Sequence, residues 1–348
     1  MLEIVNLSNH TSDVKTIQND VKVLKSFLKT HNLDGLEMMF SGPWDADLHP
    51  KELIRGSHLR YFPNWLDFWL EDQEALLREL ESEAKITEIF GGLKKENLLL
   101  AYEKNITTAV NAGASYLVFH VSQARQSEIF SRKFHYESKQ IIKETINLVN
   151  ELLPVIPPHV ALLFENLWWP GLTLLDKDLL EALITGVKHP NTGVMLDTGH
   201  LMNTDPNLKT ETDAIEYVLH TLKNLGKSQA YIQGMHFHHS LSGRFVRKAT
   251  HFLQKPPADR AKIWRYISRI DQHLPFTLPA AGKIVETVRP KFLVHEFLFP
   301  SLEIWSEKVG KQRAALGYTE TTIFTKDFAN ELDAQTNNHF NYSGRITC

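Results

Sequence analysis

The sequence predicts an α/β fold of the (β/α)8 TIM barrel class, with an extended segment after the seventh strand and a polar C-terminal tail. Eight short apolar runs alternate with amphipathic helical segments, the pattern of a parallel sheet covered by helices. Six of the runs end in Asp, Glu or His, at the strand ends where a barrel gathers its active site. No G-x-G-x-x-G motif follows the first strand, which disfavours a doubly wound open sheet.

The strands are predicted where short apolar runs are bounded by turn residues or helices. They cover residues 4–7, 33–40, 54–62, 116–120, 160–165, 194–197, 231–238 and 292–296. Helices are predicted where apolar residues recur at spacings of three and four. They cover residues 14–28, 71–84, 94–112, 137–153, 177–187, 211–225, 261–273 and 301–316. We therefore expect one catalytic barrel domain over residues 1–316 and a C-terminal extension over residues 317–348.

The composition is typical of a soluble globular enzyme, with 43% apolar and 23% charged residues. A net charge of −3 gives no overall attraction to nucleic acid. The single cysteine, Cys348, is typical of a reducing compartment. The N-terminus carries no basic flank and apolar signal core, and no apolar run approaches a membrane span. We expect a cytoplasmic protein without a membrane partner.

Polar residues at the predicted strand ends form one candidate ring. The members are His58, His120, Glu165, Asp197 with His200, His236 with His238, and Glu296. Taken singly, His58 and His120 are more typical of hydrogen-bonded core histidines than of ligands, and Glu165 and Glu296 could each pair with an arginine. Together, the two glutamates, the aspartate and the three histidines His58, His120 and His236 cannot all be buried without a counter-charge. These ligand types suit Zn²⁺ or Mn²⁺, and we expect one or two ions held by Glu165, Asp197, His236, Glu296, His58 and His120.

Aromatic and basic residues near the strand ends are candidates for substrate binding. Trp168 and Trp169 follow Glu165 closely and could form the wall of a pocket. For Trp65 and Trp69, packing between loops is at least as good an interpretation. A phosphate or carboxylate could be bound by Arg60, Arg125, Arg244 or Arg247, although surface arginines are common.

Four motifs identify a family resemblance. Phe164-Glu-Asn166, Leu196-Asp-Thr-Gly-His200, Met235-His236 and Val294-His-Glu296 together resemble the xylose isomerase-like TIM barrel superfamily. This superfamily includes sugar epimerases and isomerases, inosose dehydratases and endonuclease IV, the AP endonuclease family 2 type. The epimerase branch implies one ion, often Mn²⁺, held by Glu165, Asp197, His236 and Glu296. The endonuclease branch implies a second zinc held by His58 and His120, with Glu165 as the bridge.

The chain departs from both branches. Epimerases usually carry an arginine six residues after the strand-seven histidine, and Ser242 occupies that position. Endonuclease IV holds a third zinc with a residue matching His200 and an Asp-x-His pair after strand seven, whereas residues 244–251 contain no aspartate. We therefore expect a small-molecule substrate and no nucleic acid.

Three functional interpretations follow. The first is an isomerase or epimerase of a sugar, sugar phosphate or polyol. We rank it first because of the range of enzymes in the superfamily. Glu165 and Glu296 would be base and acid, and His200 would orient a substrate oxygen. Further substrate contacts would come from Trp168, Trp169, His238, Arg244 and Arg60. The second is a two-metal phosphoester hydrolase, for which the resemblance suggests a small phosphodiester such as the nucleotide loop of a cobamide. The third is a barrel that has lost catalysis and binds a metal or ligand structurally.

Overall fold

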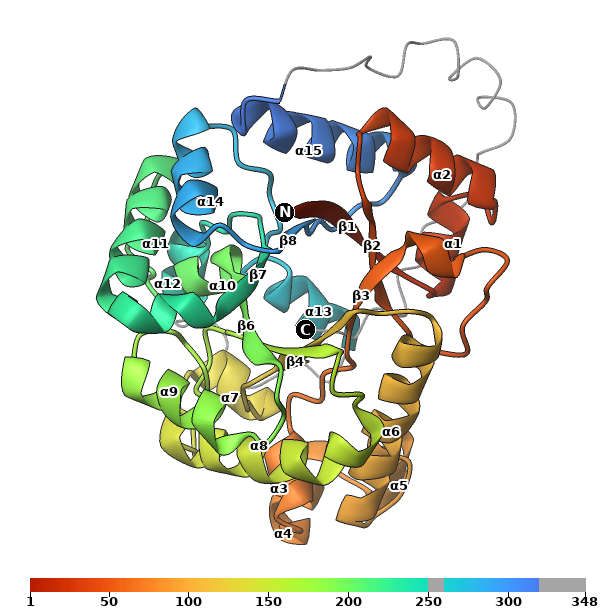
Figure 1. The fold of residues 1–348 in the computed structure, drawn as a ribbon. Helices are drawn as coiled ribbons and strands as arrows, with labels where there is room; N and C mark the ends of the chain where they lie inside the picture. Colours follow the sequence, from red (N-terminus) through yellow and green to blue (C-terminus); the bar gives the residue numbers. More distant parts are fainter. Residues whose placement is uncertain (250–259, 319–348) are drawn as a thin grey trace.

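Eight parallel strands form a closed barrel in which each strand pairs with the next along the chain and β8 returns to β1. The structure is a computed structural model that describes residues 1–249 and 260–318. Helices surround the strands on all sides (Figure 1), which confirms the predicted (β/α)8 barrel. The strands are β1 (Leu2–Ser8), β2 (Gly35–Met39), β3 (Ile54–His58), β4 (Tyr116–His120), β5 (Ala161–Glu165), β6 (Thr192–Asp197), β7 (Ile232–His236) and β8 (Phe292–His295).

The eight predicted helical segments are helical, with two breaks that the periodicity did not show, and five short helices at 65–69, 126–131, 198–202, 243–249 and 282–288 were not predicted. Gln18 and Asn19 have left-handed φ values of 57° and 52°, so the helix expected over 14–28 is two helices. Glu81, with φ of 67°, divides the helix expected over 71–84 in the same way. The first part of the chain contains α1 (Thr11–Thr16), α2 (Val21–Thr30), α3 (Trp65–Trp69), α4 (Gln73–Leu80), α5 (Glu83–Phe90), α6 (Lys95–Asn111), α7 (Gln126–Ser131) and α8 (Ser138–Leu152).

The second part contains α9 (Lys177–Gly186), α10 (Thr198–Met202), α11 (Glu211–Leu225), α12 (Gly243–Ala249), α13 (Arg260–Ile267), α14 (Gly282–Val288) and α15 (Leu302–Ala315). Two strands end clearly before the predicted residue, since β3 ends at His58 and not at residue 62, and β7 ends at His236 and not at residue 238. At His238 the backbone N–H donates to the Thr198 hydroxyl at 3.2 Å and no longer to a neighbouring strand. Helix α13 ends six residues before the predicted end at residue 273.

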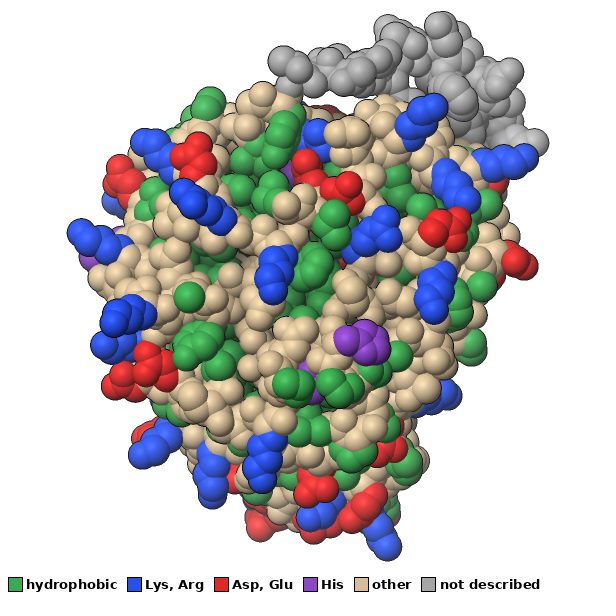
Figure 2. Space-filling view, viewed as in Figure 1, with side chains coloured by type: hydrophobic (Ala, Val, Ile, Leu, Met, Phe, Trp, Pro, Cys, Tyr) green, Lys and Arg blue, Asp and Glu red, His purple; other side chains and the backbone are tan. Residues whose placement is uncertain are grey.

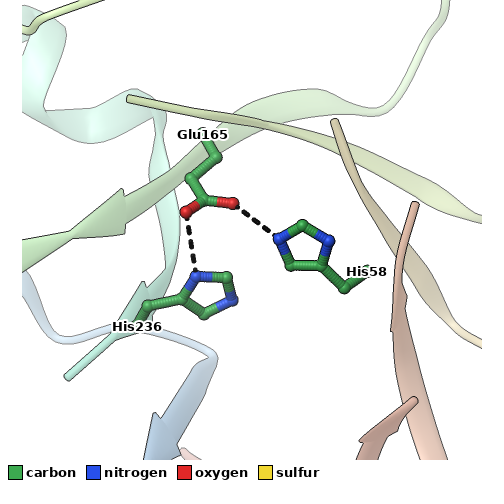
Figure 3. A group of neighbouring side chains, drawn as sticks. All are labelled: His58, Glu165 and His236. Atoms are coloured by element: carbon green, nitrogen blue, oxygen red, sulfur yellow. Dashed lines mark hydrogen bonds and ion pairs between the residues drawn. The ribbon is translucent and has the colours of Figure 1, made fainter. Parts of the chain in front are cut away.

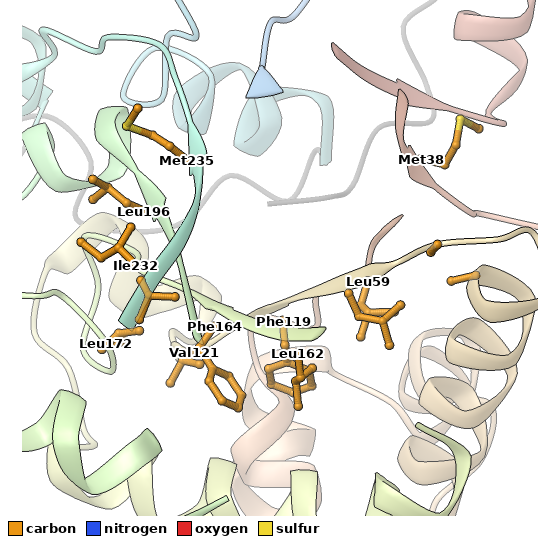
Figure 4. Close-up of a cluster of buried hydrophobic side chains, with 14 of the residues drawn as sticks. Met38, Leu59, Phe119, Val121, Leu162, Phe164, Leu172, Leu196, Ile232 and Met235 are labelled. Carbon is orange, nitrogen blue, oxygen red and sulfur yellow. The ribbon is translucent and has the colours of Figure 1, made fainter. Parts of the chain in front are cut away.

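Strand alternation separates two apolar regions. Odd and even positions of a strand face opposite sides, so Phe119 and Phe164 pack toward the helices in the large outer core (Figure 4). The barrel interior is filled by a second layer made of Ile4, Tyr116, Val118, Ala161, Leu163, Met195 and Val294. Burial of each large apolar side chain contributes about 1.5–3 kcal/mol. The same alternation turns the last residue of β4, β5, β6 and β7 into the barrel at its C-terminal end.

One glycine makes a connection across the barrel interior possible. A Cβ at Gly56 would lie 2.0 Å from Cζ of Tyr116, so only glycine leaves room for this ring. The Tyr116 hydroxyl therefore reaches the buried Glu37 carboxylate and donates to it at 2.7 Å. Glu37 is thereby positioned directly beneath the ring of strand-end residues.

A separate apolar cluster covers the C-terminal end of the barrel. It joins Tyr61 and Trp169, from the loops after β3 and β5, to Phe130 of α7, Val246 of α12 and Tyr266 of α13. In Figure 1, α13 is seen through the ring of strands at the far end of the barrel. Helices α12 and α13 belong to the predicted extended segment after β7, and residues 250–259 between them lie outside the described residues.

The division into a domain at 1–316 and an extension at 317–348 stays a prediction, since residues 319–348 lie outside the described part of the chain. Within residues 1–249 and 260–318, none of the helices has the length and apolar character needed to cross a bilayer. On the face of the molecule in Figure 2, basic and acidic side chains are interspersed.

Candidate metal centre

The ring residues are brought together by the register of the barrel. His120 is directly opposite Glu165, and Asp197 is directly opposite His236. His58 ends β3, and Glu296 follows the last residue of β8. All the strand-end positions named from the sequence therefore face one centre at the C-terminal end of the barrel.

Glu165 lies at the middle of the ring and is 1% exposed. Its Oε2 is 3.0 Å from Nε2 of His58 and 3.3 Å from Nε2 of His120. Its Oε1 is 3.2 Å from Nδ1 of His200 and 3.3 Å from Nδ1 of His236. Figure 3 shows His58 and His236 pointing toward the two oxygens from different strands. One carboxylate thus faces two pairs of histidines, the arrangement needed to bridge two cations.

The second oxygen of Glu37 determines how His236 presents its ring. His236 Nε2 lies 2.9 Å from Glu37 Oε1. With Nε2 donating to this carboxylate, Nδ1 of the neutral ring is left as the lone-pair nitrogen. That Nδ1 lies 3.3 Å from Glu165, 3.3 Å from Glu296 and 3.8 Å from Asp197. Sequence reasoning placed Glu37 inside a strand but did not assign it to the site.

A third group consists of His200, Asp271 and His273, and its last two members were missed. Asp271 Oδ2 is 3.3 Å from His200 Nε2 and 3.3 Å from His273 Nδ1. All three side chains are buried. The signal is present in the sequence as Asp271-Gln-His273, which lies beyond α13 and outside residues 244–251, the stretch taken to correspond to the endonuclease pair. The missing aspartate at 244–251 therefore does not mean that this segment lacks an Asp-x-His pair.

His238 lies inside the ring with no exposed surface, although the sequence suggested a substrate contact. Its Nε2 is 3.0 Å from Asp197 Oδ2 and 3.7 Å from Glu296 Oε2. Asp197 uses its other oxygen to accept the N–H of His200 at 2.6 Å, as the N-cap of α10. This arrangement holds the Oδ2 atom toward the centre.

The other residues predicted to contact substrate lie at different distances from the ring. Trp168 is half-buried, with its ring 5.0 Å from that of His200, whereas Trp169 is buried in the covering apolar cluster. The exposed Arg60 stacks on Phe62 and donates to a carbonyl of α5, and Arg244 is exposed on α12. The structure does not bring these two arginines into the ring.

Three other candidates have structural partners. Arg125 forms a bidentate ion pair with the buried Asp67, at 2.7 and 2.9 Å. Trp65 donates its indole N–H to the carbonyl of Ser122 at 2.8 Å, and Trp69 packs against the main core. For these tryptophans the packing interpretation describes the structure.

The charges in the ring shift the pKa values of its histidines. Burial lowers the pKa of His200, but the carboxylates of Asp197 and Asp271 outweigh burial and raise this pKa well above its ordinary value. Burial also lowers the pKa of His236, and the Glu296 carboxylate outweighs it and raises the pKa well above its ordinary value. A divalent ion that binds here must displace these protons, so its affinity will depend on pH.

Several buried polar atoms are not satisfied by the protein. Burial raises the pKa of Glu165, yet His120 and His236 hold this pKa well below its usual range. Even so, Glu165 Oε1, His236 Nδ1 and Glu296 Oε2 form no hydrogen bond within the described residues. Buried polar atoms are rarely left in this state. Cations between these atoms would satisfy all three, so the residues present fit divalent metal.

Within residues 1–249 and 260–318, four groups of three residues bring their ligand atoms within 4.8 Å of one another. Glu165 belongs to two of them, and His238 belongs to the other two. The groups are His58–Glu165–His236, His120–Glu165–His200, His238–Asp271–His273 and Asp197–His238–Glu296. The centre therefore offers several overlapping groups of buried side chains that could hold a divalent ion.

Comparisons with known proteins agree with this architecture. A family model described as xylose isomerase-like TIM barrel matches residues 26–278. Endonuclease IV from Thermus thermophilus has 14% identity and a TM-score of 0.51, covering 91% of this chain and 99% of that chain. D-psicose 3-epimerase from Clostridium cellulolyticum H10 has 14% identity and a TM-score of 0.46, covering 91% and 97%. No functionally curated protein matches the chain. At these identities the similarity to solved structures concerns the fold alone.

Proposed function

Because the chain belongs to the xylose isomerase-like TIM barrel family, we propose that it is a metal-dependent hydrolase of a small-molecule phosphoester. The observation that carries this proposal is the group His200–Asp271–His273, which adds a third set of ligands to the two centred on Glu165. An isomerase that binds a single ion would leave most of these buried ligands without a role.

The ligands divide naturally into three sets. His58, His120 and Glu165 would hold one ion, and the shared Glu165 with Asp197, His236 and Glu296 would hold a second. His200, Asp271 and His273 would hold a third. Bound divalent ions would supply Lewis acidity, which activates a water molecule and stabilises the negative charge of a phosphoryl group and its leaving oxygen.

The protein's own residues would orient the groups of the site and exclude bulk water from it. His200 donates its Nδ1 proton to the carbonyl of Asn166 at 2.9 Å, which directs Nε2 toward Asp271. The Glu296 side chain is 12% exposed, against 0–6% for His236, His238 and His58. Glu296 would therefore be positioned to accept the proton of the attacking water. Trp168, close to His200, would cover the substrate and limit the entry of bulk water.

A small substrate is supported by the surroundings of the ring. The ring histidines and Glu165 are buried, and the apolar cluster that includes Tyr61, Trp169 and Tyr266 covers this end of the barrel. A duplex would have to be distorted, at a cost in unstacking free energy, to bring a phosphate to side chains buried to this degree. A flexible phosphodiester of small size could reach them beside Glu296.

Isomerisation of a sugar or polyol is the second candidate. It is favoured by the position of Glu165 and Glu296, each 3.3 Å from His236 Nδ1, since two carboxylates beside one ion can exchange protons with a bound substrate. This reaction leaves Asp271 and His273 unexplained. For that reason we place it second.

The two reactions are distinguished by one experiment on metal-loaded protein. We expect Zn²⁺- or Mn²⁺-loaded protein to hydrolyse bis(p-nitrophenyl) phosphate, and Asp271→Asn to lower the rate by about 100-fold, as for loss of one group that stabilises transition-state charge. In parallel, ketohexoses are incubated in D2O and C–H exchange is followed by NMR. Exchange without phosphoester hydrolysis would overturn the hydrolase and support the isomerase. If neither reaction occurs in metal-loaded protein, both proposals fail and a non-catalytic barrel is left.

A further inference from the structure

We propose that His238 is a metal ligand, which gives the ion beside Asp197 and Glu296 a second imidazole and directs this site toward zinc over manganese. This inference rests on the metal centre of the proposed function but is independent of the reaction that the centre catalyses. It also replaces the role in substrate binding that the sequence suggested for His238.

The position of the ring nitrogens supports ligation. His238 Nε2 lies 3.0 Å from Asp197 Oδ2 and 3.7 Å from Glu296 Oε2. Nδ1 of His236 faces the same two residues at 3.8 and 3.3 Å. An ion placed between the two carboxylates would therefore meet one nitrogen from each histidine.

The ring of His238 is fixed by its neighbours. It stacks on His273, with centroids 4.2 Å apart and planes inclined by 17°. On the other side a Cβ at Gly199 would lie 2.1 Å from Cε1 of His238, so the ring occupies the space that a side chain at position 199 would fill. The backbone of His238 is fixed as well, because the hydroxyl of Thr198 lies 2.6 Å from its carbonyl oxygen and accepts from its N–H.

A contact with substrate is a poor explanation for this placement. His238 has no exposed surface, and its Nδ1 is buried without a hydrogen-bond partner within the described residues. Nε2 faces the carboxylates of Asp197 and Glu296, so a cation between their oxygens would be bound by Nε2 without any substrate reaching the ring.

A second imidazole changes which metal the site prefers. Carboxylate and water ligands suit Mn²⁺, whereas imidazole suits Zn²⁺ and other later metals. Glu165, Asp197, Glu296 and His236 alone would form a site with three carboxylates and one imidazole. Adding His238 increases the nitrogen share and should raise zinc affinity more than manganese affinity.

The test compares metal affinities of metal-free protein by competition with a chelator. We expect His238→Asn to weaken the tightest Zn²⁺ site by more than the about 10–100-fold that loss of an outer-shell partner of a ligand costs, and to change Mn²⁺ affinity much less. The control is His239→Asn, because His239 is adjacent and buried, but its ring packs 5.5 Å from that of Phe276. Circular dichroism establishes that each variant is folded.

A second variant, Gly199→Ala, and a second readout, the absorption spectrum of bound Co²⁺, test the proposal independently of the His238→Asn affinities. Gly199→Ala places a methyl group against the His238 ring and should lower the ratio of zinc to manganese affinity in the same direction. With Co²⁺ as the probe, loss of one nitrogen ligand should alter the visible absorption in both variants and not in His239→Asn. An unchanged affinity ratio in folded His238→Asn overturns the proposal. If the wild type binds zinc but cleaves no phosphoester, the proposed function fails, and the metal affinities of His238→Asn and wild type still test whether His238 is a ligand. If the wild type binds no metal, both fail.

Discussion

Glu37→Gln should weaken metal binding without a large change in packing. Glu37 is 1% exposed and contacts two groups, the Tyr116 hydroxyl at 2.7 Å and His236 Nε2 at 2.9 Å. Glutamine has nearly the same volume and can keep a hydrogen bond to each group, accepting from His236 and donating to Tyr116. The substitution therefore removes the negative charge that orients His236 and makes its Nδ1 more basic.

The expected effect follows from the role of a carboxylate behind a ligating histidine. Losing such a partner costs about 10–100-fold in metal affinity, which corresponds to about 1.4–2.8 kcal/mol. This range agrees with about 1.5–3 kcal/mol for a hydrogen bond to a charged group. Because the contact is with His236, the loss should fall on the ion beside Asp197 and Glu296, and the His200–Asp271–His273 group should be unaffected.

The assay is chelator competition for Zn²⁺ with metal-free protein, and Glu3→Gln is a matched control. Glu3 is also a largely buried carboxylate paired with a buried histidine, His295 Nε2 at 2.6 Å, but this pair lies outside the ring. We expect Glu3→Gln to lower the free energy of unfolding while leaving zinc affinity unchanged. Equal zinc affinity in Glu37→Gln and wild type would refute the reasoning.

Two further predictions concern metal number and pH. Replacing His58 and His120 together with glutamine should remove one ion per chain and leave the ion at Glu165, Asp197, His236 and Glu296, as measured by metal content; loss of all metal would contradict separate sites. His31, whose Nε2 lies 2.8 Å from the Ser306 hydroxyl, has its pKa lowered to about 4, first by burial and then by Arg313. The unfolded chain therefore takes up this proton first, and the stability that neutral His31 provides is lost as pH falls from about 6.5 toward 4. Between pH 7 and pH 5, the free energy of unfolding of His31→Gln should fall by about 1 kcal/mol less than that of the wild type, allowing for partial exposure of the ring. An equal fall in both proteins, measured by denaturant unfolding at the two pH values, would contradict this.

The barrel and most of its ring could be predicted because they depend on local pattern. Alternation along β5 determines that Glu165 faces inward once Leu162 and Phe164 face the helices, and the same reasoning applies to Asp197 and His236. Hydrophobic periodicity could not show the helix break at Gln18 and Asn19, because it records which positions are apolar and carries no information on a positive φ.

The rest of the site depends on contacts between segments far apart in the sequence. Asp271 and His273 lie beyond α13 in a segment without strand register, so no periodicity places them near His200. Glu37 contacts His236 directly and is held by Tyr116, for whose ring Gly56 leaves room, a relationship among several strands that no single strand pattern contains. Arg125 looked available for an anion because nothing in the sequence identifies Asp67 as its partner.

The proposed ligands lie at or after the C-terminal ends of β3 to β8, and the last of them along the chain is Glu296. β8 closes the circle by pairing with β1, and Glu296 follows β8 directly. The unfolded chain offers only short local pairs, such as Asp197 with His200, and these cannot assemble the centre before the last strand docks. Metal binding therefore stabilises the closed barrel and contributes little to the early stages of folding. Through Asp197, His236 and Glu296, a bound ion would join the segment after β8 to the ends of β6 and β7, so slow release of the ion would report how seldom this last segment separates from them in the folded protein.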